Sequence, residues 1–219
     1  MTTPDYEAAA RKAMETLIKN KITTAPVTPL PIFKHADGVL VLSFAEMSGM
    51  AAIDRSSLID LFGDNQDAAT IHMPEGPLRY VVAYNQRLPM YMLQRALARE
   101  LGHILLGHDG TTRTTEARMA EAYCFAHHLL CPRPLIHAIQ EANIPLTVEV
   151  LGSATGCYER CLAGIRKEPG VHVPAELNRA VKELFSDWLQ NFLAFQPILS
   201  RDDQSDLANF GHYMDNYEE

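Results

Sequence analysis

The 219-residue chain is 47% hydrophobic and 21% charged, which is typical of one globular domain, or one domain with an appendage, and not of a disordered chain. Its net charge of −8 argues against a broad nucleic-acid-binding face, because such a face needs clustered basic side chains to neutralise phosphates. Since no apolar stretch approaches the roughly 20 residues that cross a bilayer, and the N-terminal residues do not resemble a signal peptide, we expect a cytoplasmic protein without membrane contacts.

The first half of the chain predicts one helix and a small antiparallel sheet. Residues 4–22 place apolar side chains on one side of a helix, whereas the run at 39–44 is short, apolar and β-branched, as in a strand. Residues 57–62 favour a short helix. The runs at 68–73 and 78–84 are strand-like and are separated by Pro-Glu-Gly-Pro, which predicts a hairpin.

After Pro89 the pattern becomes helical. Apolar residues recur at the helical period from Leu93 to Leu105, and further helices are expected at 115–130, at 132–142, within 147–167 as two short helices, and at 174–195. These elements predict an α+β fold. In it, an N-terminal helix and a small antiparallel sheet pack on the helix that ends near Leu105, and a mostly helical C-terminal half follows.

The chain has four cysteines, which we expect to be reduced because they are few and no secretory signal precedes them. Cys157 and Cys161 lie one helical turn apart, a spacing that also occurs in metal sites. Buried thiols often behave as small apolar side chains. We therefore interpret this pair as structural.

The segment with the clearest chemical content is Arg99-Glu100-Leu101-Gly102-His103. In zinc-dependent peptidases a helix carries His-Glu-x-x-His, in which two histidines one turn apart bind the metal and the glutamate acts as general base on the metal-bound water. A third ligand comes from a later helix. Glu100 and His103 occupy the glutamate and second-histidine positions, but Arg99 stands where the first histidine belongs.

A second stretch, Glu121-Ala122-Tyr123-Cys124-Phe125-Ala126, begins eighteen residues after His103. Together with the preceding strand pair, the two stretches resemble the ImmA/IrrE family of metallopeptidases, from the N-terminal helix to about residue 134. The resemblance implies a cytosolic, zincin-like endopeptidase fold. It also implies that Glu100 would be the general base and that His103 and Glu121 would be zinc ligands.

The resemblance further implies a regulatory role and a plan of domains. Members of this family typically cleave or regulate helix-turn-helix repressors of mobile elements, or control stress responses, so we expect a protein partner of that kind.

We assign residues 1–142 to the metallopeptidase-type domain, 143–199 to a helical extension and 200–219 to an acidic tail. Residues 201–219 hold six acids and one base, and thus −5 of the net charge of −8. This tail is either a solvated terminus or a segment that folds over the cleft.

Arg99 decides between the functional hypotheses. A catalytic zinc needs three protein ligands and an open position for water, whereas a guanidinium has no lone pair to give and repels a dication. Arg99 could instead stand where the metal stood, by pairing with Glu121 or with Glu100. The favoured hypothesis is therefore a degenerate, metal-free pseudoenzyme that binds a protein without cutting it, and no cofactor is expected.

The alternative hypothesis is an active zinc endopeptidase in which another side chain replaces the missing histidine. Cys124 or His128, on the same stripe of the second helix as Glu121, could complete a ligand set with His103. His108 matches a histidine often found at the end of the motif helix in the family, where it is not a usual ligand. It lies about 140° round an ideal helix from His103, so we expect it to be a poor partner.

A third hypothesis is purely structural. In it, Arg99, Glu100 and Glu121 form an ordinary salt-bridge cluster with His103 in the core. The aromatic residues of the last helix likewise allow two interpretations, either closing the helical half or forming a docking surface. With the two family stretches in register, an inherited active-site cleft is the better interpretation of the motif.

Overall fold

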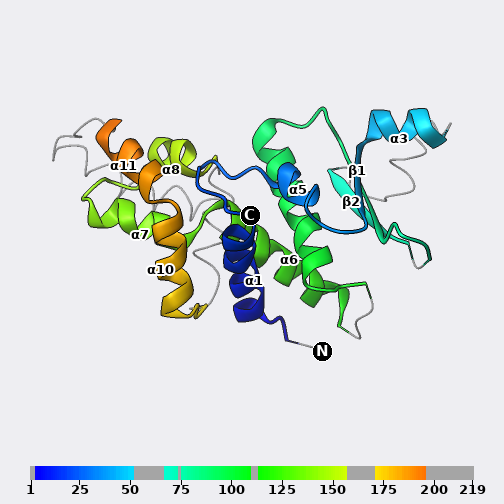
Figure 1. The fold of residues 1–219 in the computed structure, drawn as a ribbon, viewed down its shortest axis with the longest axis horizontal. Coiled ribbons are helices and arrows are strands. Elements are labelled where there is room, and N and C mark those ends of the chain that lie inside the picture. Colours follow the sequence, from blue (N-terminus) through cyan, green and yellow to red (C-terminus); the bar gives the residue numbers. More distant parts are fainter. Residues whose placement is uncertain (1–2, 52–66, 74, 110–112, 157–170, 196–219) are drawn as a thin grey trace, which may run out of the picture.

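The computed structural model describes residues 3–51, 67–73, 75–109, 113–156 and 171–195. They form the expected α+β fold, in which a small sheet and a group of helices lie side by side (Figure 1). In this described part no helix is both long and apolar enough to cross a membrane. Outside it lie the helix expected at 57–62, much of the pair expected within 147–167, Cys157, Cys161 and the acidic tail.

The sheet has three strands in the order β1-β3-β2, namely β1 (Val39–Ser43), β2 (Ala68–His72) and β3 (Tyr80–Tyr84). Strands β2 and β3 form the expected antiparallel hairpin, with His72 opposite Tyr80. Strand β1 runs parallel to β3, so the sheet is mixed where an antiparallel one was expected. Alternating apolar residues define the buried face of a strand but not the direction of its neighbour. The helix α3 (Phe44–Ala51) that follows β1 belongs to a longer connection, which permits parallel pairing.

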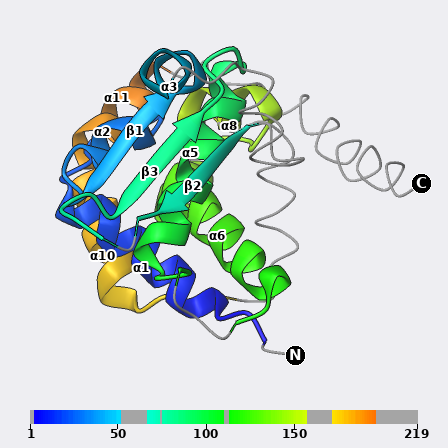
Figure 2. The ribbon, with the colours of Figure 1, turned by 90° about the vertical axis from the view of Figure 1, so that its right-hand side faces the viewer.

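Three helices position the site: α1 (Tyr6–Lys19), α5 (Met90–Leu105) and α6 (Thr115–Leu130). Figure 2 shows the strands lying over α5, with α6 and α1 farther from the sheet. Helix α1 begins at Asp5, whose Oδ1 accepts a hydrogen bond from the Ala8 N–H at 2.9 Å, as an N-cap residue does. Helix α5 buries Arg99 and Glu100 among its apolar residues, so the charged motif lies inside the protein.

One hydrophobic core joins these helices to the C-terminal ones. Met14 of α1 and Phe125 of α6 are fully buried in it, together with Val181 and Phe185. The other helices are α2 (Pro29–Phe33), α7 (Arg133–Glu141), α8 (Val148–Thr155), α10 (Ala175–Leu184) and α11 (Ser186–Phe195). Residues from the expected helical extension thus contribute to the main core, and the domain boundary after residue 142 stays a prediction.

The single helix expected at 174–195 is two helices in the structure, with a bend at Phe185. The two parts bury their apolar faces in different places: Phe185 lies in the main core, whereas Leu189 lies in a smaller cluster. Periodicity alone does not reveal such a change of partner. Trp188 and Phe192 stack with ring centroids 4.9 Å apart and pack on the smaller cluster. This packing supports the interpretation that the segment closes the helical half.

Gly102 allows α5 and α6 to approach closely. A Cβ atom at this position would lie 3.0 Å from Phe125 Cδ1 and 3.2 Å from the Ala122 carbonyl oxygen. We expect Gly102→Ala to lower the free energy of unfolding by about 1–3 kcal/mol in urea denaturation, because the helices would have to separate. Gly152→Ala in α8 is the matched control, since its Cβ would meet no described atom within 4 Å and should stabilise by about 0.5–1 kcal/mol. Equal stabilities of the two variants would contradict the close approach.

Candidate active-site cleft

A cleft of about 290 Å³ lies between β2 and the C-terminal part of α5. Thr70, His72 and Tyr80 line it from the sheet, Glu100 and His103 line it from α5, and His108, Asp109 and Arg118 line it from the residues that follow. The cleft thus contains two of the predicted motif residues, Glu100 and His103. The other two, Arg99 and Glu121, are buried beside it, with exposed fractions of 4% and 2%.

The Arg99 side chain is held by a buried ion pair. Its Nε and Nη2 atoms donate to Glu100 Oε1 at 2.9 and 2.7 Å, and Nη2 also donates to the Ala68 carbonyl oxygen of β2 at 3.0 Å. The guanidinium lies 5.8 Å from the centroid of the Tyr123 ring. Burial lowers the pKa of Arg99, but Glu100 and Tyr123 outweigh that effect, so the pKa is raised and the cation persists. Of the two contacts expected for Arg99, the structure shows the one with Glu100.

Glu100 has donors on both of its oxygens. Oε1 accepts from Arg99, and Oε2 accepts from the Thr70 hydroxyl at 2.8 Å. Burial raises the pKa of Glu100 above its ordinary value, against the opposing effects of Arg99 and Thr70. A general base needs a lone pair directed at the water or proton that it activates. In this arrangement both oxygens are already engaged by side chains of the protein.

A turn at the end of α5 brings His108 back to His103. Gly107 has φ +67°, and the His108 N–H donates to the His103 carbonyl oxygen at 3.0 Å while the Gly107 N–H donates to Ile104 at 3.1 Å. This pair of bonds is a Schellman motif, in which the residues three before and two after the helix cap meet. The Nδ1 atoms of His103 and His108 are consequently 2.8 Å apart. The expectation that His108 is a poor partner of His103 is therefore wrong, because the helical period stops applying where α5 ends.

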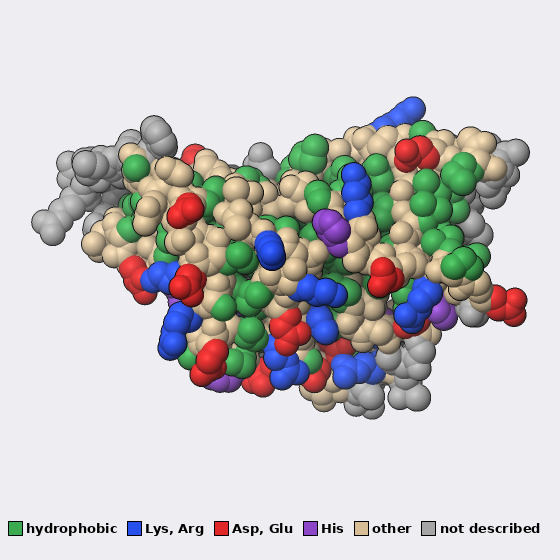
Figure 3. All heavy atoms as spheres, viewed as in Figure 1, with side chains coloured by type: hydrophobic (Ala, Val, Ile, Leu, Met, Phe, Trp, Pro, Cys, Tyr) green, Lys and Arg blue, Asp and Glu red, His purple; other side chains and the backbone are tan. Residues whose placement is uncertain are grey.

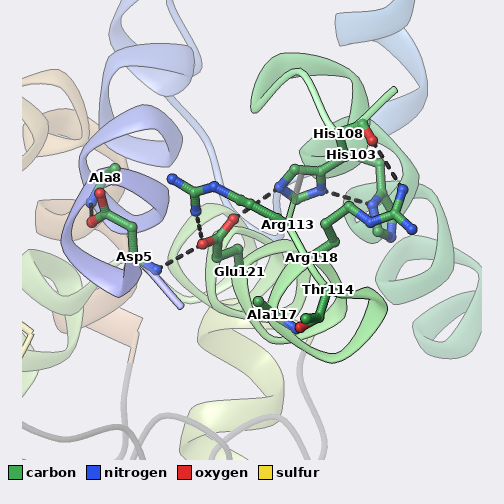
Figure 4. Close-up of polar contacts among 9 residues, drawn as sticks. All are labelled: Asp5, Ala8, His103, His108, Arg113, Thr114, Ala117, Arg118 and Glu121. Atoms are coloured by element: carbon green, nitrogen blue, oxygen red, sulfur yellow. Dashed lines mark hydrogen bonds and ion pairs between the residues drawn. The ribbon is translucent and has the colours of Figure 1, made fainter. Parts of the chain in front are cut away.

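His108 also reaches Glu121, so that one imidazole lies between the two expected zinc ligands. His108 Nε2 is 3.0 Å from Glu121 Oε2. The other carboxylate oxygen, Oε1, accepts from the Arg113 guanidinium and from the Asp5 N–H, the latter at 2.7 Å. Figure 4 shows these side chains converging on Glu121 from three segments of the chain. The carboxylate of Glu121 is thus compensated by partners within the protein.

Both histidines are held in the neutral form. Burial lowers the pKa of His103 to about 3, with further lowering by His108, Arg99 and Arg118. Burial also lowers the pKa of His108 to about 4, with further lowering by Arg113 and Arg118 and some raising by Asp109. A neutral imidazole has one donor and one acceptor nitrogen. We therefore assign the donated protons as His103 Nδ1–H to His108 Nδ1 and His108 Nε2–H to Glu121.

The two candidate substitute ligands lie in α6 and are not among the described residues that line the cleft. Cys124 is buried in the main core, and its Sγ is 3.5 Å from the Tyr6 carbonyl oxygen of α1. His128 is fully buried one turn farther along α6. The structure therefore brings His103 and Glu121 together through His108 and places Cys124 against α1.

This arrangement does not fit a catalytic zinc ion. Such an ion needs three protein ligands directed at one point. Among the described residues, no group of three or more His, Cys, Asp and Glu side chains is arranged to hold a metal. His103 and Glu121 instead face opposite nitrogens of the His108 ring. Arg99, at the position of the missing histidine, adds a positive charge nearby.

A second polar cluster, which the sequence did not predict, lies at the rim of the cleft. Asp109 Oδ2 accepts from the Tyr80 hydroxyl at 2.8 Å and is 3.2 Å from His72 Nε2. The hydrogen bond from Tyr80 is the main reason that the pKa of Asp109 is lowered, and His72 and Arg79 lower it further. The predicted hairpin could have indicated this cluster, because its register places His72 opposite Tyr80. The cluster gives the cleft hydrogen-bonding groups on two sides.

The small sheet beside the motif helix, and the Glu-x-x-His pair on that helix, agree with the expected metallopeptidase-like fold. Residues 58–150 match the family model of the IrrE N-terminal-like domain (Peptidase_M78). This match confirms the resemblance to the ImmA/IrrE family over those residues, which make up less than half of the chain. No similarity to a curated protein or to a solved structure was found.

Proposed function

We propose that this protein is a regulatory, protein-binding module built on a metallopeptidase-like scaffold, which neither holds zinc in its cleft nor cleaves its partner. The observation that carries the proposal is the position of His108, whose ring lies between His103 and Glu121. The buried Arg99–Glu100 pair supports it, because it engages the residue that would act as general base. A helix-turn-helix repressor in the cytoplasm is the partner class that the family favours.

Two separate features oppose zinc binding. A complete structural zinc site contributes about 10–16 kcal/mol, so the loss of one ligand forfeits several kcal/mol of this. In addition, zinc would have to break the hydrogen bonds of His108 with His103 and Glu121. A hydrogen bond to a charged group contributes about 1.5–3 kcal/mol. Restoring the missing histidine alone therefore leaves the second obstacle in place.

The test is the zinc content of four proteins, purified without chelators or a metal-affinity tag: the parent, Arg99→His, His108→Ala and the double variant. We expect almost no zinc in the parent and in His108→Ala, and about one zinc per chain in the double variant. The double variant should also bind zinc about tenfold or more tightly than Arg99→His, because the competing hydrogen bonds of His108 are gone. Elemental analysis and competition with a chelating dye measure these quantities.

The opposite result has a clear meaning. Stoichiometric zinc in the parent, together with chelator-sensitive cleavage of a helix-turn-helix repressor, would favour an active endopeptidase. The missing ligand would then come from a side chain such as Cys124 or His128, and Glu100→Gln should abolish cleavage. Binding of the repressor without cleavage, at a metal content near zero, is the outcome that the proposed function predicts.

A further inference from the structure

A second pocket, of about 550 Å³, lies between α7 and α10, at the end of the molecule away from the sheet (Figure 1). Its apolar lining includes Pro134, Val171 and Val173. All three of these residues are buried. Three cationic side chains also line the pocket and are less buried than this apolar part, namely Arg133, Arg179 and Lys182. The pocket therefore combines an apolar floor with a basic rim.

The basic rim contrasts with the rest of the protein. Among the described residues that line the pocket, three are Arg or Lys and one, Glu141, is acidic, whereas residues 1–200 as a whole hold 18 basic and 21 acidic side chains. Figure 3 shows basic side chains next to acidic ones over α7 and α10. An anionic group in this pocket would meet a local excess of positive charge, which favours its binding.

Lys182 is the cation of the rim whose donors allow a further anion to bind. Arg133 Nη1 donates to the Val171 carbonyl oxygen at 3.3 Å, which orients the guanidinium. Lys182 Nζ is 2.7 Å from Glu141 Oε2, but these two side chains are 49% and 66% exposed. An exposed pair of this kind contributes only about 0–1 kcal/mol. Since an ammonium has three donors, Lys182 can bind a second carboxylate while it keeps Glu141.

We propose that this pocket binds the acidic segment 201–219 of the same chain. The segment lies outside the described residues, but its composition complements that of the pocket. It has six acids and one base, and Phe210, Tyr213 and Tyr217 are interspersed among the acids. Its carboxylates match the basic rim, and its aromatic rings match the apolar floor. The tail is thus assigned to a pocket remote from the cleft, and the inference does not depend on the proposed function.

The connection is long enough for this contact. Helix α11 starts directly after α10 and has ten residues, so it carries the chain about 15 Å along its axis. The seven residues from 196 to 202 span up to about 25 Å when extended. The first acids can therefore return to Lys182, and covalent attachment raises the local concentration of the segment to the millimolar range.

The test is zero-length crosslinking of the full chain with a carbodiimide, which condenses a lysine amine and a nearby carboxyl group into an amide with loss of water. We expect amides between Lys182 and acids of residues 201–219 in the monomeric protein. The yield should fall in about 0.5 M salt, because screening shortens the range of exposed charges. The amide between Lys182 and Glu141, whose N and O atoms are 2.7 Å apart, is the internal control for the reagent.

Two variants make the result specific. Arg179→Glu removes one cation of the rim and should lower the yield of the tail amide about fivefold, the factor for roughly 1 kcal/mol. Lys19→Glu, at another pocket between α1 and the sheet, should leave the yield unchanged. The proposal is overturned if the Lys182–Glu141 amide forms without any tail amide, or if Arg179→Glu has no effect. It is also overturned if mixed isotopic samples show tail amides only between two copies of the chain.

Discussion

Replacement of Arg99 by methionine is expected to lower the free energy of unfolding by about 3–5 kcal/mol at pH 7.5. Removing one partner of a buried ion pair leaves the other charge uncompensated, and effects of this size are typical. The Arg99 and Glu100 side chains are each only 4% exposed, so water solvates the remaining carboxylate poorly. Urea denaturation, followed by the fluorescence of Trp188 and by circular dichroism, would measure the change.

The loss should depend on pH in a defined direction. Burial already raises the pKa of Glu100, and Arg99 opposes that increase. In the variant the folded-state pKa therefore lies still farther above the unfolded value. A carboxyl group whose pKa is raised by folding stabilises the protein below its unfolded pKa and loses this effect as the pH rises. Arg99→Met should consequently cost less at pH 5 than at pH 8.

The matched control is the double variant Arg99→Met/Glu100→Gln. It removes both charges and retains an acceptor for the Thr70 hydroxyl, so most of the lost stability should return. A double variant as unstable as Arg99→Met would show that the guanidinium stabilises mainly through its contacts with Ala68 and Tyr123. That result would contradict the importance assigned to the ion pair.

Acidification is expected to destabilise the protein by about 3 kcal/mol between pH 6.5 and pH 4.5, after allowance for partial exposure and for coupling of the two histidines. Unfolded histidines take up protons near pH 6.5, whereas His103 and His108 do so at pKa values of about 3 and about 4 in the folded protein. The unfolded state thus binds more protons in this range, and stability must fall as the pH falls. Denaturation curves at a series of pH values would show it.

His108→Gln separates these histidines from the other titrating groups. It removes one of the two neutral imidazoles and keeps an amide that can hydrogen-bond to Glu121. The pH dependence of the unfolding free energy between pH 6.5 and pH 4.5 should then be about half as steep. If the curves of parent and variant were parallel, His108 would not titrate abnormally, and the assigned hydrogen bonds would be wrong.

The sequence predicted the elements that carry the motif better than it predicted the contacts of the motif. The expected helix at 115–130 coincides with α6, and the apolar repeat after Pro89 identified α5, because both helices bury a long stripe on one side. The same helical periodicity wrongly predicted that His108 points away from His103. A residue beyond the helix cap follows the turn geometry of Gly107, and an angle calculated on an ideal helix does not describe it.

The hydrogen-bond partners of Glu121 and Glu100 could not be predicted from the sequence, for a different reason. Asp5 donates to Glu121 across 116 residues, and Thr70 donates to Glu100 across 30 residues. No local pattern records which backbone N–H or hydroxyl will meet a buried carboxylate. The sequence indicated that each acid needed compensation, since buried charges are paired, but the tertiary structure selects the donor.

Asp5 connects the N-terminal end of α1 to the middle of α6 by a hydrogen bond. Its side chain caps α1, while its own N–H holds Glu121. The family match begins at residue 58, far beyond this contact. A protein cut back to the matched segment would lose α1, expose the apolar face of α6 that α1 covers, and deprive Glu121 of a donor. We therefore expect that the smallest unit that folds with a complete cleft is larger than the segment that matches the family model, and that it includes the first turn of α1.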